Sequence, residues 1–253
     1  MNAALSVILG IIIAIVGLFI IYLLVLNISA FLVNPHKIYE DDSKYYRFLF
    51  NLSTFFTIKI MRIRLHVSGL EKVPKEGRFV LVGNHVSNYD PILTEYVLKD
   101  RQLAFISKEA NMHIPAFGRI IRRMCFLSID REHPSIAAQT IYKAADMIKQ
   151  DKVSFAVYPE GTRSKSGELL SFHNAVFKVP KTADVPIIVM SIEGTNSIFK
   201  DFIWKRTDVY LDFLEVLDKE YVEANRTHEI GERVEKILRE KLEQEYKEET
   251  IDG

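Results

Sequence analysis

The first 35 residues of the chain contain no charged side chain, and Ala3 to Val33 is almost entirely aliphatic residues, Phe and Gly. A helix of about 20 apolar residues is long enough to cross the hydrocarbon core of a bilayer. The run therefore predicts a membrane helix, with its spanning part near Leu5 to Leu26, because Asn27 and Ser29 make the remainder more polar. Tilting, or a tail in the interface, would accommodate the surplus length.

A cleaved signal peptide is the alternative for this run. It is disfavoured because no Lys or Arg precedes the run, and because the apolar core of a signal peptide has only about 7 to 15 residues. Basic and histidine side chains instead follow the run: His36, Lys37, Lys44, Arg47, Lys59, Arg62 and Arg64. By the positive-inside rule we predict a membrane protein with a single N-terminal span and with everything after it on the cytoplasmic side.

The next part of the chain mixes aromatic and basic side chains. The stretch Tyr45 to Leu65 is too charged to span a bilayer and is typical of an amphipathic helix in the membrane interface. An ordinary core helix of the following domain is the alternative. We therefore divide the chain into an anchor (1–35), an interfacial helical segment (36–65) and a domain (66–253) that ends in an amphipathic helix.

Short apolar runs alternate with helical patterns through the domain. This alternation predicts an α/β fold, with a mixed, mostly parallel sheet flanked by helices. The expected strands are Phe79 to Val82, Leu103 to Ile106, Phe126 to Ile129, Val153 to Val157, Ile187 to Ile192 and Val209 to Leu214, with Arg64 to Val67 as an edge strand. The expected helices are Pro91 to Leu98, Ser135 to Gln150, Ala175 to Thr182 and Thr227 to Tyr246, with Pro115 to Arg122 as a shorter one.

Composition argues against several classes of protein. The 33 basic and 33 acidic side chains balance, which gives no reason to expect a nucleic-acid partner. The single cysteine, Cys125, excludes an internal disulfide, and its apolar neighbours predict a small core residue. His113, His133 and His173 are scattered along the chain without a ligand-like spacing, so we expect no metal site.

A histidine and an aspartate follow the first buried strand of the domain. Asn84 and His85 come directly after it, and Asp90-Pro91 predicts a helix start with Asp90 as the N-cap. On one continuous helix the two side chains would point apart, whereas a turn between them can bring the carboxylate to the imidazole. A carboxylate on one ring nitrogen leaves the other nitrogen free to take a proton, which predicts a general base. A structural histidine and a metal ligand are the alternatives.

A second polar loop follows the strand Val153 to Val157. Gly161 permits a close approach of the backbone, Thr162 offers a hydroxyl, and Arg163 offers a bidentate fork suited to phosphate. An ordinary polar turn is the alternative. Further basic candidates, each by itself typical of a solvated surface charge, are Lys108, Arg131, Arg119, Arg122 and Arg123.

Four motifs in order along about half of the chain resemble those of the glycerolipid acyltransferases. Asn84 to Asp90 resembles the first motif of that family, and Pro159 to Ser164 resembles the third. Phe126 to Arg131 resembles the second motif, which ends in arginine, and Val185 to Ile188 resembles the fourth. The stretches Ser107 to Glu109 and Ile114 to Gly118 are also similar to that family.

The resemblance implies a reaction that uses no cofactor. An acyl thioester of coenzyme A or of acyl carrier protein would donate its acyl chain to the sn-2 hydroxyl of a 1-acyl-glycerol-3-phosphate (lysophosphatidic acid), giving phosphatidic acid. His85 would be the base and Asp90 its partner. The acceptor phosphate would be held by Arg131, Gly161, Thr162 and Arg163, with Lys108 and Asn84 as further substrate contacts, while Glu160 would either touch the substrate or brace the loop.

One departure concerns the stretch after the third motif. Members of the family commonly carry a basic residue and a glycine where this chain has His173 and Ala175. The departure leaves the His–Asp pair whole and the exact acceptor and donor open. The alternatives are an acyltransferase for another lysophospholipid or lipid-linked acceptor, a metal-dependent hydrolase, and an inactive lipid-binding scaffold at the membrane, which the whole motifs argue against.

Overall fold

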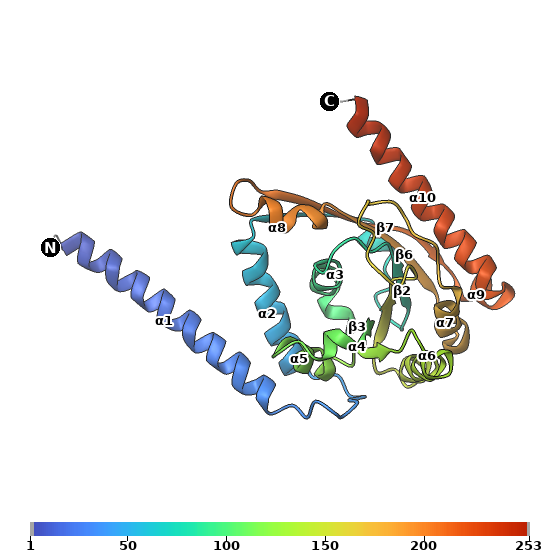
Figure 1. The fold of residues 1–253 in the computed structure, drawn as a ribbon, viewed down its shortest axis with the longest axis horizontal. Coiled ribbons are helices and arrows are strands. Elements are labelled where there is room, and N and C mark those ends of the chain that lie inside the picture. The colour runs from blue at the N-terminus through green and yellow to red at the C-terminus, as the bar shows by residue number, and fades with distance from the viewer. Residues whose placement is uncertain (1–2, 252–253) are drawn as a thin grey trace.

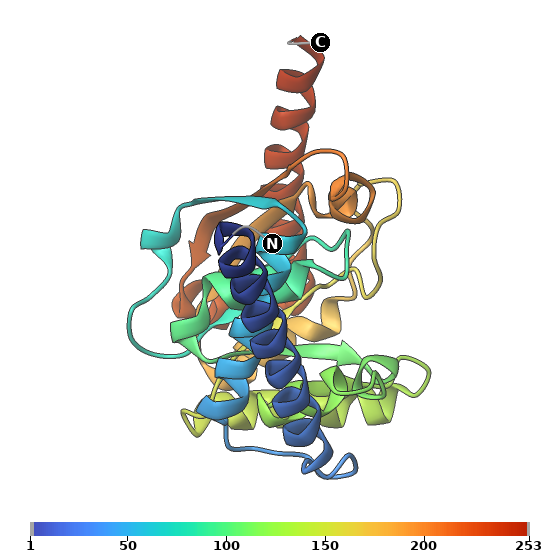
Figure 2. The same cartoon turned by 90° about the vertical axis from the view of Figure 1, so that its left-hand side faces the viewer.

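The computed structural model describes residues 3–251 of the chain and the side chains of residues 3–243. A long N-terminal helix, α1 (Ala3–Phe31), projects from an α/β domain, and a second long helix, α10 (Thr227–Ile251), ends the described chain on the other side (Figure 1). When the side of the molecule that carries the N-terminus faces the viewer, α1 lies in front of the domain (Figure 2).

One seven-stranded sheet, in the order β1-β7-β6-β2-β5-β3-β4, forms the centre of the domain. Among the described strands, only the pair β6·β7 is antiparallel, which confirms the predicted mixed, mostly parallel sheet. Every expected strand is present, including the edge strand. Their bounds are β1 (Ile63–Ser68), β2 (Val80–Gly83), β3 (Leu103–Lys108), β4 (Leu127–Ile129), β5 (Ser154–Val157), β6 (Ile187–Glu193) and β7 (Thr207–Leu217).

Helices cover both faces of the sheet, with α2, α3 and α5 on one side and α6, α7 and α10 on the other (Figure 1). The central strands β2 and β5 are buried along their whole length, as expected of parallel strands covered on both faces. The bounds of these helices are α2 (Lys44–Ile60), α3 (Asp90–Val97), α5 (Phe117–Arg123), α6 (Pro134–Lys149) and α7 (Lys178–Ala183).

Three short helices were not predicted: α4 (Glu109–Met112), α8 (Ile198–Asp201) and α9 (Lys219–Ala224). Helices of four to six residues are too short to show a hydrophobic period. The predicted helix Ala175 to Thr182 is in fact two pieces, a 3-10 turn at Asn174–Phe177 followed by α7. Because these differences lie outside the sheet, they leave the predicted topology unchanged.

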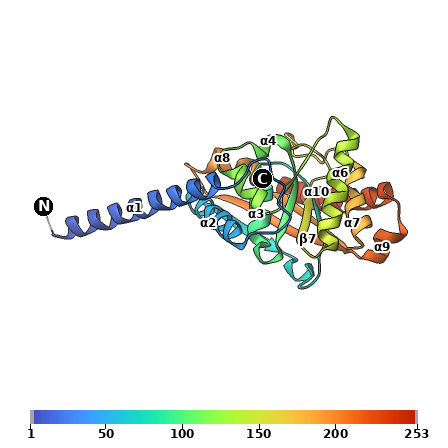
Figure 3. The ribbon, with the colours of Figure 1, turned by 90° about the horizontal axis from the view of Figure 1, so that it is seen from below.

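Helix α1 is, among the described residues, the one helix long and apolar enough to cross a membrane. Its C-terminal half packs on α2, where the rings of Phe19 and Phe56 are 5.9 Å apart and the Ser29 hydroxyl lies 2.7 Å from the Tyr45 hydroxyl. The rest of α1 extends past the domain (Figure 3). Its apolar side chains are exposed. The predicted span near Leu5 to Leu26 therefore includes a part that contacts protein.

Helix α2 has one face on the domain and one face exposed. On the inner face, the buried Arg47 guanidinium binds Asp42 at 2.6 Å and Glu95 at 2.7 Å. Arg47 therefore belongs to a buried ion-pair network rather than to the basic flank of a membrane span. Phe48, Phe55 and Ile60 remain exposed on the outer face, whose contact with a membrane interface stays a prediction.

Candidate active site

The candidate site lies where five strands of the sheet end. Strands β6, β2, β5, β3 and β4 are mutually parallel, so their carboxyl ends meet at one edge of the sheet. Loops that follow parallel strands at this edge are the usual place for binding and catalysis in open α/β sheets. The polar residues at these five ends are Thr195 after β6, His85 after β2, Glu160 after β5, Lys108 at the end of β3 and Arg131 after β4.

His85 and Asp90 are in direct contact. The Nδ1 atom of His85 lies 2.7 Å from Asp90 Oδ2, and the same oxygen accepts the backbone N–H groups of Val86 and Ser87, each at 2.7 Å. Asp90 was predicted to be the N-cap of the following helix, but it is the first residue of α3, and Tyr89 is the N-cap. The Asp90 carboxylate points back toward the preceding turn, where the backbone N–H groups of Val86 and Ser87 and the Nδ1 atom of His85 converge on it.

Two neighbours of the His–Asp pair were missed from the sequence. The Tyr158 ring stacks on the His85 ring, with centroids 4.3 Å apart and planes 10° from parallel. The buried Thr195 hydroxyl donates a hydrogen bond to Asp90 Oδ1, so both carboxylate oxygens are used. Tyr158 directly follows a predicted strand, which was a usable signal. Thr195 carried none, because it lies 105 residues from Asp90 in the chain.

The buried Glu160 side chain ties the two motif loops together. Its Oε1 accepts the His85 backbone N–H at 2.6 Å, and its Oε2 accepts the Leu170 backbone N–H at 2.9 Å. Burial raises the pKa of the Glu160 carboxyl, and the two N–H donors oppose that rise. With both oxygens bound to backbone, Glu160 braces the loop that carries His85.

The loop from Gly161 to Ser164 folds back onto His85. The backbone N–H of Ser164 donates to the His85 carbonyl at 2.7 Å. Gly161 has a φ of +68°, and a Cβ there would lie 2.8 Å from Cδ2 of His173. A residue with a side chain would therefore be strained in its backbone and would displace the imidazole of His173.

A cavity of about 320 Å³ opens beside His85. Its polar lining includes six of the predicted site residues: His85, Lys108, Arg131, Gly161, Thr162 and Arg163. Its apolar wall comes from α3, β3, α5 and their loops and includes Ile92, Phe105, Ile114, Phe117, Ile121 and Phe126. The site thus combines one imidazole, three cationic side chains and an apolar wall, a combination suited to an amphiphile with an anionic group.

Asn84 does not line this cavity. Its side-chain Nδ2 donates to the Ile192 carbonyl at 2.9 Å, and its Oδ1 accepts the Ile192 N–H at 2.8 Å. The expected substrate contact by Asn84 is therefore not supported, because both polar ends of this buried amide are already paired with β6. Asn84 instead positions the end of β2 next to His85.

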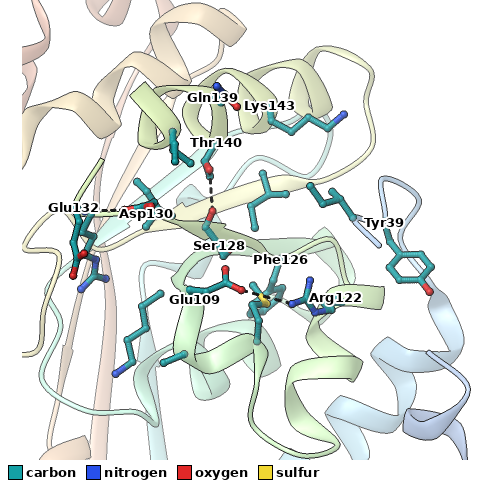
Figure 4. A pocket seen from close by; sticks show the side chains of 18 of the residues that line it. Tyr39, Glu109, Arg122, Phe126, Ser128, Asp130, Glu132, Gln139, Thr140 and Lys143 are labelled. Carbon is teal, nitrogen blue, oxygen red and sulfur yellow. Dashed lines mark hydrogen bonds and ion pairs between the residues drawn. The ribbon is translucent and has the colours of Figure 1, made fainter. Parts of the chain in front are cut away.

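A second cavity of about 840 Å³ adjoins the first, and Lys108, Phe126 and Arg131 line both. Side chains from β4, α4 and α6 converge on it, among them Glu109, Ser128 and Thr140 (Figure 4). Arg122 also lines this cavity. Arg119 and Arg123 are not among the lining residues of either cavity: Arg119 donates to the Phe31 carbonyl at 3.0 Å, and the Arg123 guanidinium lies 4.4 Å from the centre of the Tyr39 ring.

Neither a metal centre nor a thiol nucleophile is indicated in the described part of the chain. Among the described residues, no group of three His, Cys, Asp or Glu side chains is arranged to hold a metal ion. Cys125 is fully buried, and that burial raises the pKa of its thiol to about 12. A neutral, buried thiol is a poor nucleophile.

Comparison with known proteins identifies the family. A family model described as Acyltransferase matches residues 64–193, which is about half of the chain and includes every polar residue of the cavity. The chain belongs to the acyltransferase family. The resemblance noted from the motifs is thereby confirmed.

Several curated relatives of this acyltransferase are named 1-acyl-sn-glycerol-3-phosphate acyltransferase. The relative from Haemophilus influenzae is 29% identical over 56% of this chain and 58% of its own length. The relatives from Borreliella burgdorferi and Escherichia coli are 25% and 26% identical, over 70% and 66% of this chain and 72% and 67% of their own lengths. The match thus spans a little over half of the first relative and about 70% of the second.

A solved structure has the same fold. The crystal structure of the 1-acyl-sn-glycerophosphate (LPA) acyltransferase PlsC from Thermotoga maritima superposes with a TM-score of 0.67 and 25% identity, over 88% of each chain. The structural match therefore covers more of this chain than residues 64–193, which the family model matches. The α/β architecture of this acyltransferase is therefore shared across almost its whole length.

Proposed function

We propose that this acyltransferase transfers an acyl chain from an acyl thioester to the sn-2 hydroxyl of a 1-acyl-glycerol-3-phosphate, giving phosphatidic acid. The observation that carries the proposal is the placement of His85. Its Nδ1 is held by the buried Asp90, while its ring lines a cavity shared with Arg163 and Arg131. The names of the relatives support the same acceptor and product.

The proposed mechanism uses His85 as a base without a protein nucleophile. Its Nε2 takes the proton of the acceptor hydroxyl as the oxygen attacks the thioester carbonyl. The tetrahedral intermediate then expels the thiolate, and the imidazolium returns the proton to that sulfur. Asp90 stabilises the imidazolium in between and fixes the tautomer that leaves Nε2 free. A positioned base of this kind contributes about 10²- to 10⁴-fold to the rate.

The acceptor phosphate is proposed to bind at the Gly161–Arg163 loop. Arg163 offers a planar fork, Thr162 offers a hydroxyl, and Arg131 contributes a second cation from the end of β4. Partial burial lowers the pKa of the Arg131 guanidinium, but an arginine remains protonated near neutral pH. Glu160 has no part in this contact, since its oxygens bind backbone.

The acyl donor is proposed to reach His85 from the second cavity. Coenzyme A and acyl carrier protein both carry their thioester on a long phosphorylated arm. A cavity of about 840 Å³ that shares the cationic side chains of Lys108 and Arg131 with the first cavity has room for such an arm. The apolar wall beside His85 is suited to the acyl chain.

The bilayer is the proposed location of the reaction. Both the lysophospholipid and the phosphatidic acid product reside in a membrane, so an anchor shortens their route to the site. Helix α1 is the candidate anchor, and the basic residues after it favour the cytoplasmic side for the domain.

The test uses purified protein in detergent with lysophosphatidic acid and either palmitoyl-CoA or palmitoyl-acyl carrier protein, and mass spectrometry of the lipids. We expect phosphatidic acid with at least one donor and little product from monoacylglycerol, which lacks the phosphate. Arg163→Ala should raise KM for lysophosphatidic acid at least tenfold, while Arg239→Ala, an exposed arginine of α10, should not. Preference for lysophosphatidylcholine, or no product with either donor, would refute the assignment.

A further inference from the structure

A cluster of large apolar side chains lies exposed between β6 and β7. Phe199 is 74% exposed, Ile203 is 62% exposed and Trp204 is 83% exposed. Together with Lys200, Lys205 and Arg206 we call these six residues the α8 loop. Single exposed apolar side chains are ordinary, but several gathered in one segment are typical of an interaction surface.

The charges of the α8 loop favour a lipid surface over a protein partner. Lys200 follows Phe199, and Lys205 and Arg206 follow Trp204, so basic side chains flank the apolar ones; Asp201 is the one acid within the segment, where it lies 3.4 Å from Lys205. Tryptophan and phenylalanine beside basic side chains are typical of the membrane–water interface, where the rings enter the headgroup region and the cations meet lipid phosphates.

The α8 loop adjoins the helices that are candidates for membrane contact. Thr207, the next residue, pairs with Ile63 of β1, and its N–H donates to the Arg62 carbonyl. The loop therefore ends beside the C-terminus of α2, where Ile60 is 57% exposed. Figures 1 and 3 show α8 at the end of the domain from which the free part of α1 projects.

The loop is held firmly from inside. Ile198, the first residue of α8, is fully buried, and so is Thr195 in the turn before it, whose hydroxyl binds the carboxylate of Asp90. The sheet thus fixes both ends of a short loop whose apolar tip is exposed. Because its ends are fixed, the loop can bind a partner surface without first having to become ordered.

We propose that the α8 loop is a second membrane contact, which inserts Phe199, Ile203 and Trp204 into the headgroup region of an anionic bilayer. The inference rests on the membrane association proposed above and not on the acyl-transfer reaction. Alongside α1, it gives the domain a second point of attachment and so fixes the tilt of the sheet edge that carries His85 relative to the lipid surface.

The chain supplies its own reporter, because Trp204 is its single tryptophan. The full-length protein is reconstituted in vesicles of phosphatidylcholine with one third phosphatidylglycerol, with and without bromine on the acyl chains near the headgroup. We expect the bromolipids to quench Trp204 emission at least twofold. The matched control is the W204F/Y142W variant, whose reporter is on the exposed face of α6, and its emission should be unchanged.

Two further measurements separate the alternatives. The K200Q/K205Q/R206Q variant should lose most of the quenching in anionic vesicles and resemble the wild type in neutral ones. Equal quenching of both reporters, or no quenching of Trp204, would overturn the proposal. A blue shift of the Trp204 emission that grows with protein concentration in detergent would also overturn it, because the loop would then contact a second copy of the chain. Acyl transfer is assayed separately in detergent, so quenching without activity would refute the proposed function and leave this inference standing.

Discussion

Replacing Asp90 with Asn isolates the charge of the carboxylate from its role in the turn. An asparagine carbonyl oxygen can still accept the N–H groups of Val86 and Ser87 and the Nδ1–H of His85. Its amide would face the Thr195 hydroxyl, which can turn to accept. The backbone of the turn should therefore survive while the negative charge is lost.

The expected loss follows from the geometry of the pair. At an effective dielectric constant of about 20, unit charges about 4 Å apart attract one another by about 4 kcal/mol. This attraction exists only once the imidazolium forms, so its loss raises the barrier by a similar amount and lowers kcat about 10³-fold. KM for lysophosphatidic acid should change little, because no atom of Asp90 reaches the cavity.

The assay compares steady-state rates in detergent with the thermal unfolding of each variant. A matched control exists at the β1 edge of the sheet, where His66 lies 2.7 Å from Asp208 and its ring stacks on that of Tyr210, with ring centres 4.7 Å apart. Asp208→Asn makes the same chemical change in an exposed pair and should leave kcat within twofold. A loss of less than tenfold for Asp90→Asn, in a protein as stable as wild type, would show that Asp90 only shapes the turn.

Three further predictions concern residues around the site. Asn84→Ala should lower the free energy of unfolding by about 2–3 kcal/mol in urea titrations, since it removes two hydrogen bonds to Ile192 and leaves buried backbone groups unpaired; an unchanged midpoint would contradict this. Gly161→Ala should cost activity, and adding His173→Ala should restore part of it by relieving the contact, so equal activity of the single and double variants would argue against that clash. Cys125, with a pKa of about 12, should resist iodoacetamide at pH 8 in the native protein and react in guanidinium chloride, as mass spectrometry would show.

The strands and the two motif loops could be predicted because their signals are local. A buried parallel strand is a continuous apolar run, and the loop that follows it can be found without knowing its neighbours. The cation candidates Lys108 and Arg131 were found in the same way, at strand ends. Their meeting with His85 followed once the strands proved parallel and adjacent.

The contacts that cross between strands could not be predicted. Asn84 looked like part of a binding motif, but its amide pairs with a backbone 108 residues away. The pairing of Thr195 with Asp90 depends on β6 lying beside β2, which no local pattern reveals. Likewise, nothing in the sequence showed that Trp204 would be exposed, since large apolar side chains are more often found in a core.

The central claim is that His85 is the base for acyl transfer to a lysophospholipid. The most direct test measures the rate of phosphatidic acid formation from lysophosphatidic acid and whichever acyl donor, palmitoyl-CoA or palmitoyl-acyl carrier protein, the wild type uses faster. The proteins compared are the wild type, His85→Ala and, as the matched control, His66→Ala. We predict a fall of about 10³-fold or more for His85→Ala with thermal stability retained, and a near wild-type rate for His66→Ala. A His85→Ala protein that forms phosphatidic acid at the wild-type rate would contradict the account.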